Sequence, residues 1–191
     1  MNNDLNMSSD FKSNISFFHS NGYVVANSNM SDEDLNNIYN IHAKHADKDF
    51  SALMHIDRIN SKLLEYIKRP QIVSYIEHML GGVSCALMGQ MLFKKAKTIY
   101  QKQSWNIHQD NSYHQSPNGL TITANIALED VDKENGSLYL FPESHKEGLL
   151  DFEPQISFKE GKDKNPGNTI KLPDKYLEKK TDIIMKKGQI L

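Results

Sequence analysis

The chain is short of the residues that mark several classes of protein. Its 191 residues include one cysteine, Cys85, so no intrachain disulfide and no cysteine-based zinc site can form. No run approaches 18 apolar residues, so we expect no membrane-spanning helix. Residues 1–10 carry acids and amides instead of a basic stretch followed by an apolar one, so we expect no secretory signal and a cytoplasmic location.

Neither sign of charge dominates the sequence. The 22 Lys and Arg residues face 24 Asp and Glu residues, which gives a formal net charge of −2. Proteins that bind nucleic acid or anionic membranes usually carry a basic excess, so this balance argues against both kinds of partner. Aromatic residues make up 9% of the chain, too many for a disordered protein. We expect a single folded domain over 1–191, with residues 1–10 disordered.

The first half of the chain carries helix signals. Ser31 and Asp34 have the spacing of a capping box, which predicts that a helix begins there. Pro70 suits the first position of a helix, and Gly81-Gly82 suits its end. The elements expected in this half are a strand over 23–25 after the Asn21-Gly22 turn, and helices from 31 onward, over 59–67 and over 71–80.

The second half carries strand signals. From Val83 onward the apolar residues alternate with small or polar ones, and 120–128 (LTITANIAL) is rich in β-branched residues. Residues 151–181 are charged and show little hydrophobic periodicity. We therefore predict that they form a long excursion of the chain over the surface. The strands expected are 83–87, 120–128, 136–141, 181–185 and 189–191. Helices followed by short strands predict an α+β fold with a mainly β core, a jelly roll on which the N-terminal helices pack.

The densest polar cluster contains His108-x-Asp110. In a strand, residues i and i+2 point to the same face, so this imidazole and carboxylate could hold one ion together. They would supply two thirds of the 2-His-1-carboxylate set of non-haem Fe(II) oxygenases. The spacing alone is common, and it equally fits a surface His and Asp at the end of a strand.

Four segments resemble one protein family in the same order along the chain. Residues 105–113 (WNIHQDNSY) are similar to the W-x-H-Q-D-x-x-Y region of the phytanoyl-CoA dioxygenase family. Residues 128–148 (LEDVDKENGSLYLFPESHKEG) resemble the block that follows it there, including the Asn-Gly pair and the Pro-x-Ser-His turn. Residues 17–25 and 182–191 are similar to the first strand and to the "G-D-v-l" strand of the family.

The resemblance implies an Fe(II)- and 2-oxoglutarate-dependent oxygenase on a double-stranded β-helix. Such an enzyme converts 2-oxoglutarate and O₂ into succinate and CO₂ while it oxidises a small organic substrate. His108 and Asp110 are then the implied catalytic residues and iron ligands. Related halogenases have a small residue at the position of Asp110, so the carboxylate implies hydroxylation. The oligomeric state stays open.

The resemblance also implies polar residues that bind 2-oxoglutarate near the iron. On the strand before His-x-Asp, Lys94 is the first candidate and Gln90 the second. Lys94 equally fits a solvated basic edge that prevents strand pairing. Thr123 and Asn125 share a face of the next strand and are expected to line the pocket. Trp105 fits either the wall of this pocket or the core.

The third metal ligand has no counterpart. In the family, a second His and an Arg that pairs with 2-oxoglutarate follow the segment that corresponds here to 188–191, so the last strands are expected to be missing. The alternative function is therefore a truncated, inactive jelly roll with an incomplete metal site. His145 is expected to be a hydrogen-bonded turn residue, His114 a solvent or substrate-mouth residue, and His42 and His45 ordinary helix surface. Residues 149–181 are expected to form a lid-like insertion.

Overall fold

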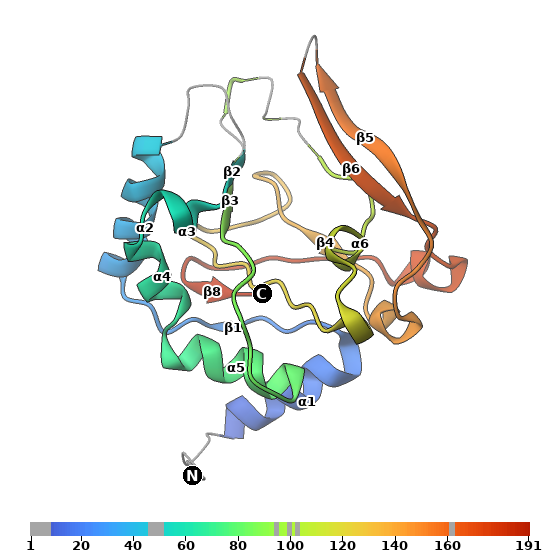
Figure 1. Ribbon diagram of the computed structural model, residues 1–191, viewed down its shortest axis with the longest axis horizontal. Coiled ribbons are helices and arrows are strands. Elements are labelled where there is room, and N and C mark those ends of the chain that lie inside the picture. Colours follow the sequence, from blue (N-terminus) through green and yellow to red (C-terminus); the bar gives the residue numbers. More distant parts are fainter. Residues whose placement is uncertain (1–8, 46–51, 94–95, 99–100, 102–103, 161–162) are drawn as a thin grey trace.

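The computed structural model describes residues 9–45, 52–93, 96–98, 101, 104–160 and 163–191. Helices dominate the first half, and the second half contains most of the strands, in antiparallel pairs separated by loops and short helices (Figure 1). The helices are α1 (Ser9–Asn21), α2 (Asp32–His45), α3 (Ile56–Ile59), α4 (Lys62–Ile67), α5 (Pro70–Leu80) and α6 (Asn111–His114). None of the helices in this described part of the chain is long and apolar enough to cross a membrane.

The capping box at the start of α2 is confirmed. The Asp34 N–H donates to the Ser31 hydroxyl at 3.1 Å, and the Ser31 N–H donates to the Asp34 carboxylate at 3.0 Å. These bonds satisfy donors that have no partner within the helix. Leu35 and Ile38 follow at helical spacing and are buried in the first core cluster. Local side-chain chemistry and one apolar face therefore define this helix.

The other predicted helices are confirmed with one change. Helix α5 ends at Gly81, whose φ of +70° is the left-handed conformation that glycine adopts most easily. The helix expected over 59–67 is two short helices, because Asn60 is extended and its side-chain oxygen accepts the Lys62 N–H at 3.0 Å.

The N-terminal segment differs from expectation at Ser9 and Asp10, which begin α1; residues 1–8 lie outside the described residues. The Phe11 ring packs on the Tyr75 ring of α5 with centroids 4.4 Å apart, and this contact holds the helix. Helix α1 runs to Asn21, so the first strand is β1 (Ala26–Asn27), later than the 23–25 predicted.

Three of the four strand pairs among the described residues join distant parts of the sequence. Strand β1, which follows α1, pairs with β8 (Gln189–Ile190), so the end of the chain lies beside a segment from its first thirty residues. The other antiparallel pairs are β2 (Ala52–Met54) with β3 (Gln90–Leu92), β4 (Tyr139–Leu140) with β7 (Thr181–Asp182), and β5 (Phe152–Glu160) with β6 (Asp163–Ile170).

Two predicted strands are weaker than expected. Segment 83–87 is extended but has no ladder partner among the described residues. In 120–128 only Ile126 forms a bridge, to Ile190, supported by backbone bonds of Asn125 and Ala127 to the last residues. Alternation of apolar and polar residues favours an extended backbone. A regular strand also needs a neighbouring strand whose hydrogen-bonding groups are in register with it.

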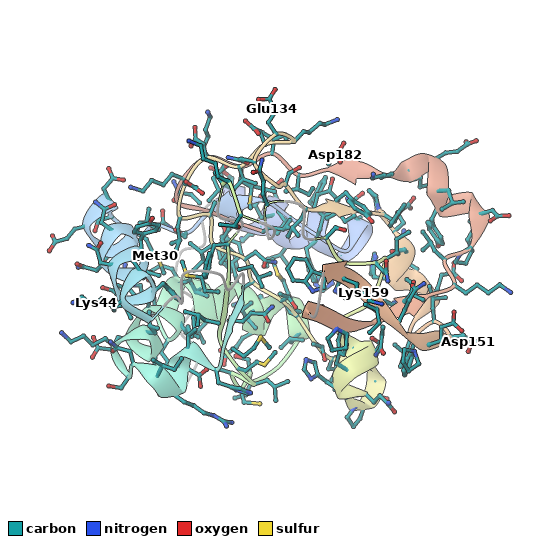
Figure 2. All side chains as sticks on the ribbon, turned by 90° about the horizontal axis from the view of Figure 1, so that it is seen from above. Met30, Lys44, Glu134, Asp151, Lys159 and Asp182 are labelled. Carbon is teal, nitrogen blue, oxygen red and sulfur yellow. The ribbon has the colours of Figure 1, made fainter. Side chains whose placement is uncertain are left out.

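The surface excursion expected over 151–181 contains regular secondary structure that its sequence pattern did not signal. Strands β5 and β6 form a long hairpin, followed by the 3₁₀ helix η4 (Asp174–Lys179). The hairpin projects from the body on the side away from α2 and α4 (Figure 1). In the view from above, Lys159 of β5 and Asp151 at its base lie at the opposite end from Met30 and Lys44 of the helical side (Figure 2).

The core has two parts. Buried side chains of the helical half form the first cluster: Met30, Leu35, Ile38, Ile56, Leu63 and Ile72. Ala127, Ile183 and Met185 form the second, beneath the strand pairs. The polar cluster described next contacts β6 of the hairpin through Ile107.

Candidate metal site

The His-x-Asp segment is irregular and belongs to no strand: Ile107 lies in a bend, and Asp110 already has helical backbone angles. The carbonyl of Ile107 accepts the Ile170 N–H of β6 at 3.0 Å and the Thr169 hydroxyl at 3.3 Å. Asp110 is the residue from which α6 begins, so the chain turns into a helix immediately after the candidate ligands. The same-face argument for a regular strand therefore does not apply here, because hydrogen bonds from β6 to Ile107 take the place of a ladder.

The two candidate ligands nevertheless face each other. His108 Nε2 and Asp110 Oδ1 are 3.4 Å apart. The other ring nitrogen, Nδ1, lies 2.7 Å from the Asn106 carbonyl oxygen, which can only accept a hydrogen bond. That contact places the proton on Nδ1 and leaves Nε2 as the nitrogen directed at Asp110. A backbone carbonyl behind a metal-binding imidazole is the usual way to fix its orientation.

The second oxygen of Asp110 has its own partner. The Thr123 hydroxyl donates a short hydrogen bond to Asp110 Oδ2. Thr123 was predicted to line the pocket, and the structure brings it into direct contact with the candidate ligand. Oδ1 thus faces His108 while Oδ2 is held, which fixes the plane of the carboxylate.

Charge and burial act on this pair in opposite directions. The Asp110 carboxylate raises the pKa of His108 above its ordinary value, and burial of the ring opposes that rise. The hydrogen bond from His108 lowers the pKa of Asp110, against the effect of its own burial, and the Thr123 hydroxyl lowers it further. The same interactions favour an ionised carboxylate, which is the form that binds metal, and a protonated imidazole, which must lose its Nε2 proton before it can bind.

The remaining predicted residues are placed less closely. Gln90 is exposed on β3, opposite Met54, and no hydrogen bond joins it to His108 or Asp110 in the described part of the chain. Lys94 lies outside the described residues. The Asn125 backbone exchanges two hydrogen bonds of 2.9 Å with Leu191, and the residue is half-buried.

The structure places three of the four other histidines for which the sequence made predictions. His145 Nε2 contacts the His19 carbonyl at 3.1 Å, in agreement with a hydrogen-bonded turn residue. His114 is exposed at the end of α6. His42 is buried, with Nδ1 2.7 Å from the Ile38 carbonyl, so the prediction of surface is wrong for it; the side chain of His45 is not described.

Several residues at the site were not predicted, although Gln109, Ser112 and Tyr113 lie in or beside the motif. The Gln109 amide donates to the Gly148 carbonyl and its oxygen accepts the Leu150 N–H, both at 2.8 Å. Asn168 of β6 donates to Ser112 and to the Tyr113 hydroxyl. Only the spacing of the motif signals Gln109 and Tyr113, and no signal in the sequence marks Asn168.

The donor set fits part of an iron site. An imidazole nitrogen and a carboxylate oxygen 3.4 Å apart can both reach one ion, because each bond to a transition metal is about 2.1 Å long. Nitrogen and oxygen donors also suit Fe(II). Within the described residues, no group of three or more His, Cys, Asp or Glu side chains could hold a metal ion. His108 and Asp110 could thus supply two of the three ligands that a facial triad needs.

Comparison with known proteins agrees with the resemblance seen in the motifs. The family model described as "Phytanoyl-CoA dioxygenase (PhyH)" matches residues 18–191. The peroxisomal phytanoyl-CoA dioxygenase of Mus musculus is 35% identical over 89 residues, 46% of this chain and 26% of the mouse protein. The L-proline trans-4-hydroxylase of Streptomyces griseoviridis is 30% identical over 89 residues, 44% of this chain and 32% of that enzyme. The matched stretch thus spans about a quarter to a third of the curated relatives.

Solved structures show the same fold. EvdO2 from Micromonospora carbonacea var. aurantiaca, complexed with 2-oxoglutarate, superposes with a TM-score of 0.64 at 12% identity, over 93% of this chain and 78% of EvdO2. The epimerase SnoN, in complex with Fe3+, alpha-ketoglutarate and nogalamycin RO, superposes with a TM-score of 0.65 at 11% identity, over 95% of this chain and 73% of SnoN. Because the family model covers nearly the whole sequence, the chain belongs to the phytanoyl-CoA dioxygenase family.

Proposed function

We propose that this protein is an Fe(II)- and 2-oxoglutarate-dependent dioxygenase that hydroxylates a small organic substrate. The observation that carries the proposal is the pair of His108 Nε2 and Asp110 Oδ1, 3.4 Å apart, with both side chains held from behind. Membership of the family and the likeness to structures that contain 2-oxoglutarate support it. On this proposal the fold is the double-stranded β-helix, and 149–181, with its hairpin, is the lid.

The chain's own residues would hold and orient the reactants. His108 and Asp110 would bind Fe(II), which supplies the redox chemistry that couples decarboxylation of 2-oxoglutarate to substrate oxidation by O₂. The Asn106 carbonyl keeps the proton on Nδ1, so that Nε2 stays available. The Thr123 hydroxyl holds Oδ2 and leaves Oδ1 to bind. We propose Lys94, Gln90, Thr123 and Asn125 as the residues nearest the 2-oxoglutarate.

The relatives suggest two substrate classes to test first. One relative is a phytanoyl-CoA dioxygenase and another an L-proline trans-4-hydroxylase, so acyl-CoA thioesters and free amino acids are the first candidates. Succinate formed from 2-oxoglutarate, with each candidate substrate, measures turnover for either class.

The decisive experiment measures binding before turnover. Fe(II) and 2-oxoglutarate are titrated without oxygen into the full-length gene product and into His108→Ala and Asp110→Asn. Loss of a direct ligand should weaken Fe(II) binding by more than the roughly 10–100-fold that loss of an outer partner costs. His78→Ala, an exposed histidine of α5, is the matched control and should bind like the wild type. If the wild type binds neither Fe(II) nor 2-oxoglutarate, the alternative of an inactive jelly roll with an incomplete metal site replaces the proposal.

A further inference from the structure

One short stretch of β6 contacts the His-x-Asp segment on both sides of the candidate ligands. Before His108, the Ile107 carbonyl accepts bonds from Ile170 and Thr169. After Asp110, the bonds come from Asn168. We call residues 167–170 the β6 brace, because they join the two ends of a segment that has no ladder of its own.

Asn168 makes the hydrogen bonds of the brace on the Asp110 side. Its backbone N–H donates to the Tyr113 hydroxyl at 2.9 Å. Its side-chain amide donates to Ser112 Oγ at 3.0 Å and to the Ser112 carbonyl at 3.3 Å. Ser112 is only 2% exposed, so water cannot readily replace the amide if it is removed.

The space around these bonds is closed. A Cβ added at Gly167 would lie 2.9 Å from Ser157 Oγ and 3.2 Å from the Tyr113 hydroxyl. Gly167 is itself buried. The brace therefore lies against the Tyr113 side chain with no room for a larger residue, and it cannot slide without breaking its bonds.

The contacts continue from α6 to the ligands. The Tyr113 N–H donates to the Asp110 carbonyl at 3.0 Å, so a shift of this one-turn helix moves Asp110 directly. The Tyr113 ring also meets the His108 ring edge to face, with centroids 5.9 Å apart. Tyr113 thus touches both candidate ligands and the brace.

We propose that Asn168 is a positioning residue of the metal site, which acts through Ser112 and Tyr113 to hold Asp110 in register with His108. The inference rests on the proposed function, because it concerns the same two ligands. It adds a residue from a strand 58 positions further along the chain than Asp110, which no motif marks. The hairpin would then serve the metal site as well as covering it.

The test is a metal titration with matched variants of the full-length protein. Co(II), an oxygen-stable substitute for Fe(II), is titrated by its visible absorption into wild type, Asn168→Ala, Tyr113→Phe and the double variant. Asn40→Ala, the same substitution at an exposed site on α2, is the control. Thermal unfolding of each protein is recorded in parallel. Tyr113→Phe keeps the ring but removes the acceptor of the Asn168 N–H.

We expect Asn168→Ala to raise the Co(II) dissociation constant about fivefold, the effect of one buried hydrogen bond. Tyr113→Phe should raise it by a similar factor, and the double variant by less than the product, since both break one network. Asn40→Ala should bind like the wild type. If Asn168→Ala does not fold, the shift in Tyr113→Phe decides the question.

Two results would overturn the inference, and they differ from each other. If the variants unfold at lower temperature but bind Co(II) like the wild type, Asn168 is merely structural, while the proposed function stands. If the wild type binds no Co(II), the inference falls together with the proposed function.

Discussion

Single atoms behind the candidate ligands set the geometry of the site. Asp110 presents one carboxylate oxygen to His108 and the other to the Thr123 hydroxyl. His108 likewise divides its ring nitrogens between Asp110 and the Asn106 carbonyl. Each ligand thus has one atom fixed and one directed at its neighbour, which is how a pair in an irregular segment keeps a defined orientation.

Gly22 provides a sharp test at the residue scale. Its φ is +84°, and a Cβ added there would lie 2.3 Å from His145 Nδ1. We expect Gly22→Ala to lower the free energy of unfolding by about 2 kcal/mol or more, through backbone strain and this clash together. Urea unfolding of the variant measures the loss.

Gly81 separates the two causes. It has a φ of +70°, but no atom lies within 4 Å of its added Cβ, so Gly81→Ala carries backbone strain alone and should cost about 1 kcal/mol. Combining Gly22→Ala with His145→Ala should remove the clash and bring the penalty down toward that of Gly81→Ala. Equal penalties for the two single variants would show that the His145 contact has no energetic weight.

At the scale of elements, Glu143 joins two 3₁₀ helices. It precedes η3 (Ser144–Glu147), and its carboxylate pairs with Lys146 of that helix and with Lys179 of η4. These two ammonium groups lower the pKa of Glu143 from 4.5 to about 2. A carboxylate whose pKa is lowered by folding stabilises the fold at every pH above the pKa that it has in the unfolded chain. This contribution is lost as the pH falls from 4.5 toward 2.

We therefore expect Glu143→Gln to flatten the decline in stability between pH 4.5 and pH 2. The effect is small because the carboxylate is exposed to solvent. Thermal unfolding across that range measures it, and Glu153→Gln, at an exposed position on β5, controls for the loss of one charge. A Glu143→Gln curve parallel to the wild type would contradict this account.

Local signals explain which elements were predictable from the sequence. The Ser31–Asp34 box and Gly81 act within four residues, and both predictions are confirmed. The β5–β6 hairpin was missed because Pro154 and Pro166 interrupt its pattern, although paired strands accommodate them. Its register depends on contacts across the hairpin and with the His-x-Asp segment, which no local period encodes.

The same distinction holds for the candidate site. His108 and Asp110 were predicted because their spacing and their neighbours resemble a family motif. The contact of Thr123 with Asp110 fits the expected pocket, whereas Asn168 depends on how a hairpin 58 residues away folds back. Sequence patterns thus predicted the candidate pair, whereas the residues that contact it required the structure.

At the scale of the whole molecule, the extended segment 83–87 has no ladder partner among the described residues, and it is apolar. Val83 is 95% exposed and Leu87 61%. An exposed, apolar extended segment is a template for pairing with another chain.

We expect the 191-residue polypeptide to self-associate as its concentration rises, and Leu87→Lys to reduce this, because a charge at such an edge opposes pairing. Sedimentation velocity over a concentration series measures the change, with a reducing agent present because Cys85 is also exposed. Leu177→Lys adds the same charge at an exposed leucine of η4, away from this segment, and should leave association unchanged. If both variants reduce association equally, net charge is the cause and the segment has no special role; if neither does, the association, where present, uses another surface.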